Sequence, residues 1–71
     1  MKTRGEIIRE KRHKMGWSLT QLSLKTGADP STISKWETQN RKPNKKFVKK
    51  LVKLFNCTVD ELFGYEREQH L

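Results

Sequence analysis

Residues 16–43, GWSLTQLSLKTGADPSTISKWETQNRKP, carry start and stop signals for two short helices. Ser18 is a favourable N-cap residue, and Gln21 stands three residues later, where a capping box places Gln or Glu. Gly27 follows, and glycine adopts the left-handed conformation that ends many helices without a steric penalty. These signals predict a first helix over residues 19–26.

The second helix of this stretch starts very soon after the first one ends. Asp29 is a typical N-cap residue, and Pro30 occupies the first helical position, where its missing N–H costs no hydrogen bond. In a helix over residues 30–38, Ile33 and Trp36 face inward because they are three residues apart. The outer face then carries Ser31, Thr32, Ser34 and Lys35. Two helices joined by so short a turn are typical of a helix-turn-helix.

The sequence before this pair is also helical by pattern. Thr3 and Glu6 form another capping box and predict a helix over residues 4–14, which Gly16 terminates. Its inward side is predicted to carry Ile8, Met15 and the aliphatic stem of Lys11, with Ile7 at the border. Trp17, just before the next helix cap, is predicted to pack over the core.

An amphipathic helix follows the pair. Asn44 is predicted to cap a helix over residues 45–55. Its apolar stripe consists of Val48, Leu51, Val52 and Phe55, widened by Phe47 and Leu54. Thr58 then starts a short last helix over residues 59–63. Five helices and no strand predict an all-α domain.

Two asparagines stand where a helix is predicted to give way to a loop. Asn40 lies in the polar segment 38–43, and Asn56 directly follows the helix over residues 45–55. Asparagine tolerates left-handed backbone geometry better than most residues. We therefore expect Asn40 and Asn56 to adopt it at these two helix ends.

Length and charge bound the domain count and the class of partner. The 71 residues make one small domain, which we place at residues 1–64, closed by Gly64 and followed by a flexible tail at 65–71. Sixteen Lys and Arg oppose eight Asp and Glu, which gives a net charge of +8 and a pI near 10. This charge fits a polyanion partner, and it also fits an ordinary basic soluble protein.

One set of residues resembles a known family. Leu22, Gly27, Ile33, Glu37 and Pro43 stand at the spacing of the phage-repressor/Cro-like (Xre-like) helix-turn-helix family, and the resemblance runs from Gly5 to Phe63. It implies a compact five-helix, lambda-repressor-like DNA-binding domain with the helix-turn-helix at helices two and three. It also implies a prokaryotic or phage transcriptional regulator, most simply a repressor, that binds double-stranded DNA as a homodimer.

The resemblance also implies roles for individual residues. The base-reading residues would be Pro30, Ser31, Thr32, Ser34 and Lys35. The phosphate-binding residues would be Ser18, Thr20, Asn40, Arg41, Lys42 and Lys45. Arg12 would form an ion pair with Glu37 and tie the first helix to the recognition helix. The dimer surface would lie near the last helix and the loop before residue 44, with Val59, Phe63 and Tyr65 as candidates.

Two other functions fit the same pattern. An antitoxin-like or adaptor protein can keep this fold and use its surface to bind another polypeptide. Such a protein should show apolar or acidic residues where Ser31–Lys35 stand here. Non-specific nucleic-acid or RNA binding is the second alternative, and an exposed pair of stacking aromatic residues would favour it.

The sequence predicts no enzyme and no cofactor. Cys57 is the single cysteine, no Cys/His grouping has zinc-ligand spacing, and no nucleophile–base pair is evident. We expect Cys57 to be a buried thiol rather than a redox sensor. No membrane-spanning or export segment is evident. We therefore expect a cytoplasmic protein without a membrane, metal or small-molecule partner.

Overall fold

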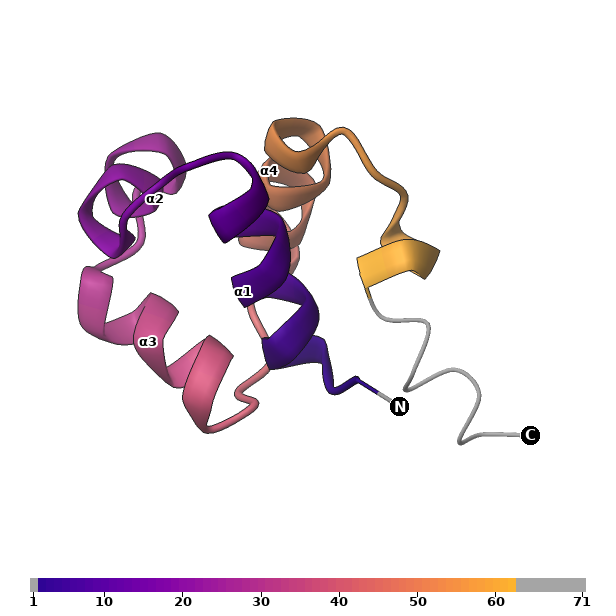
Figure 1. The fold of residues 1–71 in the computed structure, drawn as a ribbon, viewed down its shortest axis with the longest axis horizontal. Helices are drawn as coiled ribbons and strands as arrows, with labels where there is room; N and C mark the ends of the chain where they lie inside the picture. The colour runs from indigo at the N-terminus through magenta and orange to yellow at the C-terminus, as the bar shows by residue number, and fades with distance from the viewer. Residues whose placement is uncertain (1, 63–71) are drawn as a thin grey trace.

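Four helices and one further helical turn build the domain (Figure 1). The computed structural model describes residues 2–62. The helices are α1 (Arg4–Lys14), α2 (Leu19–Thr26), α3 (Pro30–Thr38) and α4 (Lys45–Phe55). Residues 59–62 form the last helical turn, and the described range contains no strand. The prediction of an all-α, five-helix fold is confirmed. Phe63, Gly64 and the expected tail at 65–71 lie outside the described residues.

The core draws one fully buried aliphatic side chain from each helix. Ile8 of α1, Leu22 of α2, Ile33 of α3 and Leu51 of α4 are all 0% exposed, as is Leu62 in the last turn. Burial of such a side chain contributes about 1.5–3 kcal/mol. α1 packs on α3, α3 on α2 and α2 on α4 (Figure 1). This packing fixes the position of the short α2–α3 pair, whose helices are too short to be stable alone.

Local signals in the sequence set the helix starts. Thr3 Oγ1 accepts from the Glu6 amide at 3.1 Å, while Glu6 Oε1 accepts from the Thr3 amide at 2.9 Å. The bond from the Thr3 amide, more than any other interaction, holds the pKa of the Glu6 carboxyl below its ordinary value. Ser18 and Gln21 form the equivalent reciprocal pair at the start of α2. Both predicted capping boxes are therefore confirmed.

Two other predicted caps are wrong in part. Asp29 and Asn44 do precede α3 and α4 with extended backbone, but neither side chain makes a capping hydrogen bond. Their backbone carbonyls act instead, accepting from Ile33 N at 3.0 Å and Val48 N at 2.9 Å. For Asp29 the following Pro30 already favours the extended conformation, so the helix starts there without help from the carboxylate.

Left-handed residues end the helices where the sequence predicts them. Gly16 has φ +75° and Gly27 has φ +83°. Asn40 and Asn56 both have φ +52°, as expected for the residues that turn the chain after α3 and α4. A substitution by a residue with a Cβ other than Asn or Asp would be strained at these positions.

Met15 is a wrong prediction. The helical period places Met15 on the inward side of the first helix, but the residue is 46% exposed. Met15 is the C-cap of α1, so the chain has already left the helix and the helical period no longer applies to it. Trp17 covers the core here instead, and its ring stacks on Phe55 with centroids 6.0 Å apart. The predicted packing of Trp17 is thus confirmed.

Candidate nucleic-acid interface

The outer side of α3 presents small polar groups and one cation. α3 lies at one edge of the molecule, with its neighbours on its other side (Figure 1). Pro30, Ser31 and Lys35 are exposed, whereas Thr32 and Ser34 are half-buried at the two borders of this face. The exposed residues of this face are free to meet a partner. The fully exposed part of the face is narrower than the sequence pattern predicts, because Thr32 and Ser34 are only partly exposed.

A hollow of about 290 Å³ opens beside this face. Its lining consists of Thr32, Lys35, Trp36, Arg41, Lys42, Asn44 and Phe47. The rings of Trp36 and Phe47 lie against each other, with centroids 5.5 Å apart. Three cationic side chains and no described carboxylate border the hollow, so it suits an anionic group such as a phosphate.

The N-terminus of α2 offers a second place for an anion. The capping box occupies the amides of Ser18 and Gln21. The amides of Leu19 and Thr20 precede the hydrogen-bond ladder of the helix and stay available to a ligand. Ser18 and Thr20 are both exposed. Free amides at a helix N-terminus are a favourable setting for a phosphate.

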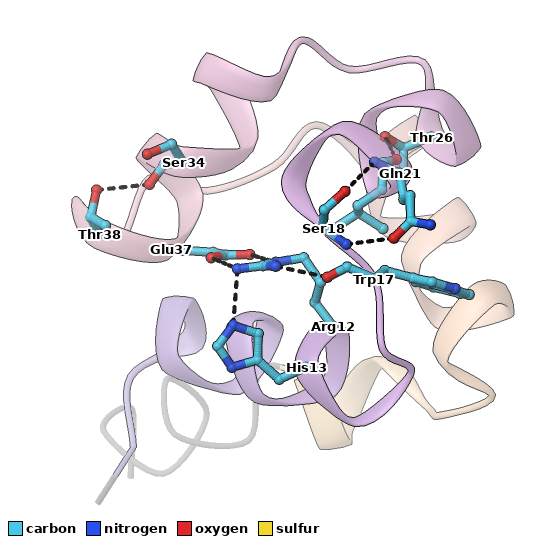
Figure 2. Close-up of polar contacts among 10 residues, drawn as sticks. Arg12, His13, Trp17, Ser18, Gln21, Thr26, Ser34, Glu37 and Thr38 are labelled. Atoms are coloured by element: carbon cyan, nitrogen blue, oxygen red, sulfur yellow. Dashed lines mark hydrogen bonds and ion pairs between the residues drawn. The ribbon is translucent and has the colours of Figure 1, made fainter.

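A buried ion pair joins α1 to α3 (Figure 2). Arg12 Nε lies 2.7 Å from Glu37 Oε2, and Arg12 Nη2 donates to Glu37 Oε1 at 3.0 Å. Arg12 Nη1 also donates to the carbonyl of Trp17 at 2.8 Å, and His13 Nε2 lies 3.3 Å from Nη2. The two charged side chains are only 9% and 4% exposed. The pair therefore fixes α3 relative to both α1 and the turn before α2.

Arg4 and Gly5, which the sequence did not single out, hold the loop after α3. Arg4 is 3% exposed, and its Nη2 donates to the carbonyl of Asn40 at 2.7 Å. The amide of Gly5 donates to Asn40 Oδ1 at 3.0 Å. The side-chain oxygen of Asn40, a predicted phosphate ligand, thus already accepts a hydrogen bond within the protein. A glycine in the first turn of a helix is the one signal that marks this contact, because glycine weakens a helix and needs another reason to be there.

The remaining predicted contact residues lie outside α3. Lys45 is exposed at the start of α4. Val59, a candidate for the dimer surface, is 47% exposed, while Phe63 and Tyr65 lie outside the described residues.

Cys57 is half-buried rather than fully buried, and burial raises the pKa of its thiol. Within residues 2–62 no three His, Cys, Asp or Glu side chains gather as metal ligands, and no helix there is long and apolar enough to cross a bilayer.

Fold and surface together define an all-helical domain whose α2–α3 pair displays a polar, basic face. A family model described as helix-turn-helix matches residues 8–62. The chain therefore belongs to the helix-turn-helix family.

Three proteins of known sequence are similar to it. It is 40% identical over 60 residues to an uncharacterized HTH-type transcriptional regulator of Archaeoglobus fulgidus, covering 84% of this chain and 24% of that one. It is 34% identical over 50 residues to the uncharacterized HTH-type transcriptional regulator YvzC of Bacillus subtilis, covering 70% and 65%. It is 34% identical over 62 residues to the B. subtilis HTH-type transcriptional regulator AnsR, covering 87% and 53%. The chain thus spans less than two thirds of each of these relatives.

One solved structure is similar over nearly its whole length. It is a crystal structure of the P22 c2 repressor protein in complex with a synthetic operator. The two chains share 30% identity and a TM-score of 0.82, covering 89% of this chain and 96% of the repressor chain.

Proposed function

We propose that the chain is a transcriptional regulator of prokaryotic or phage type that binds double-stranded DNA in a sequence-specific manner, with α3 in the major groove. The observation that carries this proposal is the exposed face of α3, which borders a hollow lined by three cationic side chains. The likeness to a repressor solved with its operator supports the same arrangement. A major groove accepts one helix, and contacts to phosphates on either side hold it there.

In this proposal the bases are read from the front of α3. Lys35 is exposed and donates to guanine O6 and N7. Ser31 is exposed on the same side, and a hydroxyl both donates and accepts. Thr32 and Ser34 reach bases only at the borders of the face, because they are half-buried. Pro30 touches the groove wall or a thymine methyl.

The phosphates on the two sides of the groove are held differently. Arg41 and Lys42 occupy the hollow side and supply charge, with Lys45 exposed close by in the sequence. Ser18 and Thr20 act with the free amides of α2, where hydrogen bonding matters more than net charge. Each lysine or arginine that neutralises a phosphate makes binding more sensitive to salt.

A homodimer on a two-fold operator completes the proposal. Dimers of helix-turn-helix domains bind half-sites about one helical turn apart. Val59 is the described candidate for the contact between copies because it is an exposed apolar residue in the last turn. By covering an operator in this way, the chain acts as a repressor in the cytoplasm and not as an enzyme.

The rival, an adaptor that binds another protein through this fold, requires a different surface. The two residues exposed at the centre of the outer face of α3 are Ser31, which carries a hydroxyl, and Lys35, which is basic. Neither is apolar or acidic. That chemistry suits base edges and phosphates better than a protein groove.

Selection of bound duplexes from a random pool at physiological salt tests the proposal. We expect enrichment of one consensus with two-fold symmetry, which reports both sequence reading and dimerisation. Recovery of the starting pool without enrichment would overturn sequence-specific binding, and recovery of a single asymmetric half-site would overturn the dimer.

A further inference from the structure

The loop after α3 takes its shape from α1. Asn40 has left-handed backbone, with φ +52°, and the next amide, that of Arg41, donates back to the carbonyl of Lys35 at 3.2 Å. Both hydrogen-bonding oxygens of Asn40 accept from α1, the side-chain oxygen from the Gly5 amide and the carbonyl from Arg4. The residue that reverses the chain is therefore held at two points by one neighbouring helix.

The approach of α1 to this loop depends on Gly5. A Cβ atom at Gly5 would lie 2.7 Å from the carbonyl oxygen of Glu37 and closer still to that of Trp36. Without a side chain there, the first turn of α1 lies directly on the end of α3. The Arg4 guanidinium then stands near the carbonyl end of α3, where a cation is favoured. Burial lowers the pKa of Arg4, but an arginine keeps its charge at neutral pH.

We propose that Arg4, Gly5 and Asn40 form a latch that sets the backbone of the loop and so aims Arg41 and Lys42 at DNA phosphates. The inference rests on the proposed function, since it concerns the side chains that would hold phosphate. Asn40 is in this view a positioning residue and not a phosphate ligand, unlike its predicted role. Arg41 and Lys42 line the hollow beside α3 only while the chain turns at Asn40 as it does here.

Salt dependence separates these two roles of Asn40. A neutral amide that contacts a phosphate displaces no counterion, so its loss weakens binding without changing the slope of log K against log salt. A latch acts through two cations. Its loss lowers the slope by about 0.9 for each phosphate contact that goes with it.

The matched control is Asn56. It has the same residue type and the same φ of +52°, but it follows α4 rather than α3. Asn40→Gly and Asn56→Gly make the same chemical change and both keep left-handed freedom. We expect Asn40→Gly to lower the salt slope on a mixed-sequence duplex by about one to two, and Asn56→Gly to leave it unchanged. An unchanged slope in Asn40→Gly, with weaker binding, would overturn the latch in favour of direct contact.

A second variant and a double-mutant cycle sharpen the test. Arg4→Met removes the donor to the Asn40 carbonyl and should also lower the slope, provided that circular dichroism shows it folded; a folded Arg4→Met with the wild-type slope would argue against the latch. Arg41→Ala should have less effect on binding in the Asn40→Gly background than in the wild type, because the latch acts through Arg41. Fully additive effects would show that Asn40 and Arg41 act independently and would overturn the proposal.

A measurement without DNA separates failure of the latch from failure of the proposed function. Hydrogen exchange of the Arg41 amide reports the turn itself, since that amide is bonded to Lys35. We expect its exchange to become faster in Asn40→Gly and to stay unchanged in Asn56→Gly. Faster exchange in a protein that binds no DNA would overturn the DNA-binding role but not the latch geometry. Unchanged exchange would overturn the latch even if the wild type binds DNA.

Discussion

The inner and outer sides of α3 have opposite surroundings. On the inner side Ile33 and Trp36 are buried, and Glu37 is paired with Arg12. On the outer side Ser31 and Lys35 are exposed to solvent. The helix is thus held entirely from one side and leaves the other free for a partner. Substitutions on the inner side should change folding stability, and substitutions on the outer side should change only what the protein binds.

The largest effect is expected at the buried pair. Glu37→Gln leaves the Arg12 guanidinium buried without its carboxylate, and breaking such a pair costs about 3–5 kcal/mol. Urea unfolding of the wild type and of Glu37→Gln measures the loss in the free energy of unfolding. The control is Glu10→Gln, which breaks the exposed pair between Lys2 and Glu10, whose side chains are 60% and 54% exposed. An exposed pair contributes at most about 1 kcal/mol, and equal losses in the two variants would contradict the burial argument.

The next effect belongs to the outer side. Lys35→Ala should leave the free energy of unfolding unchanged, because Lys35 is exposed. It should reduce discrimination at one base pair of the selected consensus by about 1–3 kcal/mol. Competition binding with single-base operator variants measures this. Lys49→Ala, an exposed lysine on α4, is the control and should keep the wild-type preference; an identical loss on consensus and random duplex would remove Lys35 as a base reader.

A smaller and sequence-independent effect is expected at the hollow. Arg41→Ala should weaken binding to every duplex and lower the slope of log K against log salt by about one. Arg9→Ala, which removes an exposed arginine from α1, should leave the slope as it is. Titrations of duplex DNA with each variant at several salt concentrations measure this slope. If the two variants show the same slope, Arg41 does not neutralise a phosphate.

The smallest effect compares the two capping boxes. The Glu6 pKa is lowered in the folded protein, so the Glu6 carboxylate stabilises the fold above its unfolded pKa, and this stability is lost as pH falls through its folded pKa. Glu6→Gln keeps an acceptor but does not titrate. We expect the difference in Tm between wild type and Glu6→Gln to shrink on acidification. Gln21→Ala changes the uncharged capping box of α2 and should lower Tm by the same amount at neutral and acid pH. If the Tm of Glu6→Gln and that of the wild type ran parallel with pH, the stabilising role of the Glu6 carboxylate would be contradicted.

Features set by neighbours in sequence were predictable. The bounds of α1, α2, α3 and α4, both capping boxes and the left-handed Asn40 follow from residues a few positions apart. The Arg12–Glu37 pair came from the family resemblance, since periodicity alone gives Arg12 no partner. At the site, exposure of Ser31 and Lys35 followed from the helical period of α3.

Features set by tertiary contact were not predictable. Apart from the glycine at position 5, nothing in the local pattern shows that the first turn of α1 lies on the end of α3, and the pattern does not predict the roles of Arg4 and Gly5. The helical period puts Met15 in the core only if it continues past residue 14, and α1 ends there, with Met15 as its C-cap. The half-burial of Thr32 and Ser34 likewise depends on how neighbouring segments pack against α3.

The most direct test of the central claim is an NMR titration of the protein with its selected duplex. If the outer side of α3 enters the major groove, the amide resonances of Ser31 and Lys35 should shift strongly, together with those of Leu19 and Thr20 at the start of α2. The amide of Lys49 on α4 should stay near its free position. Shifts confined to α4, with Ser31 and Lys35 unmoved, would contradict the account.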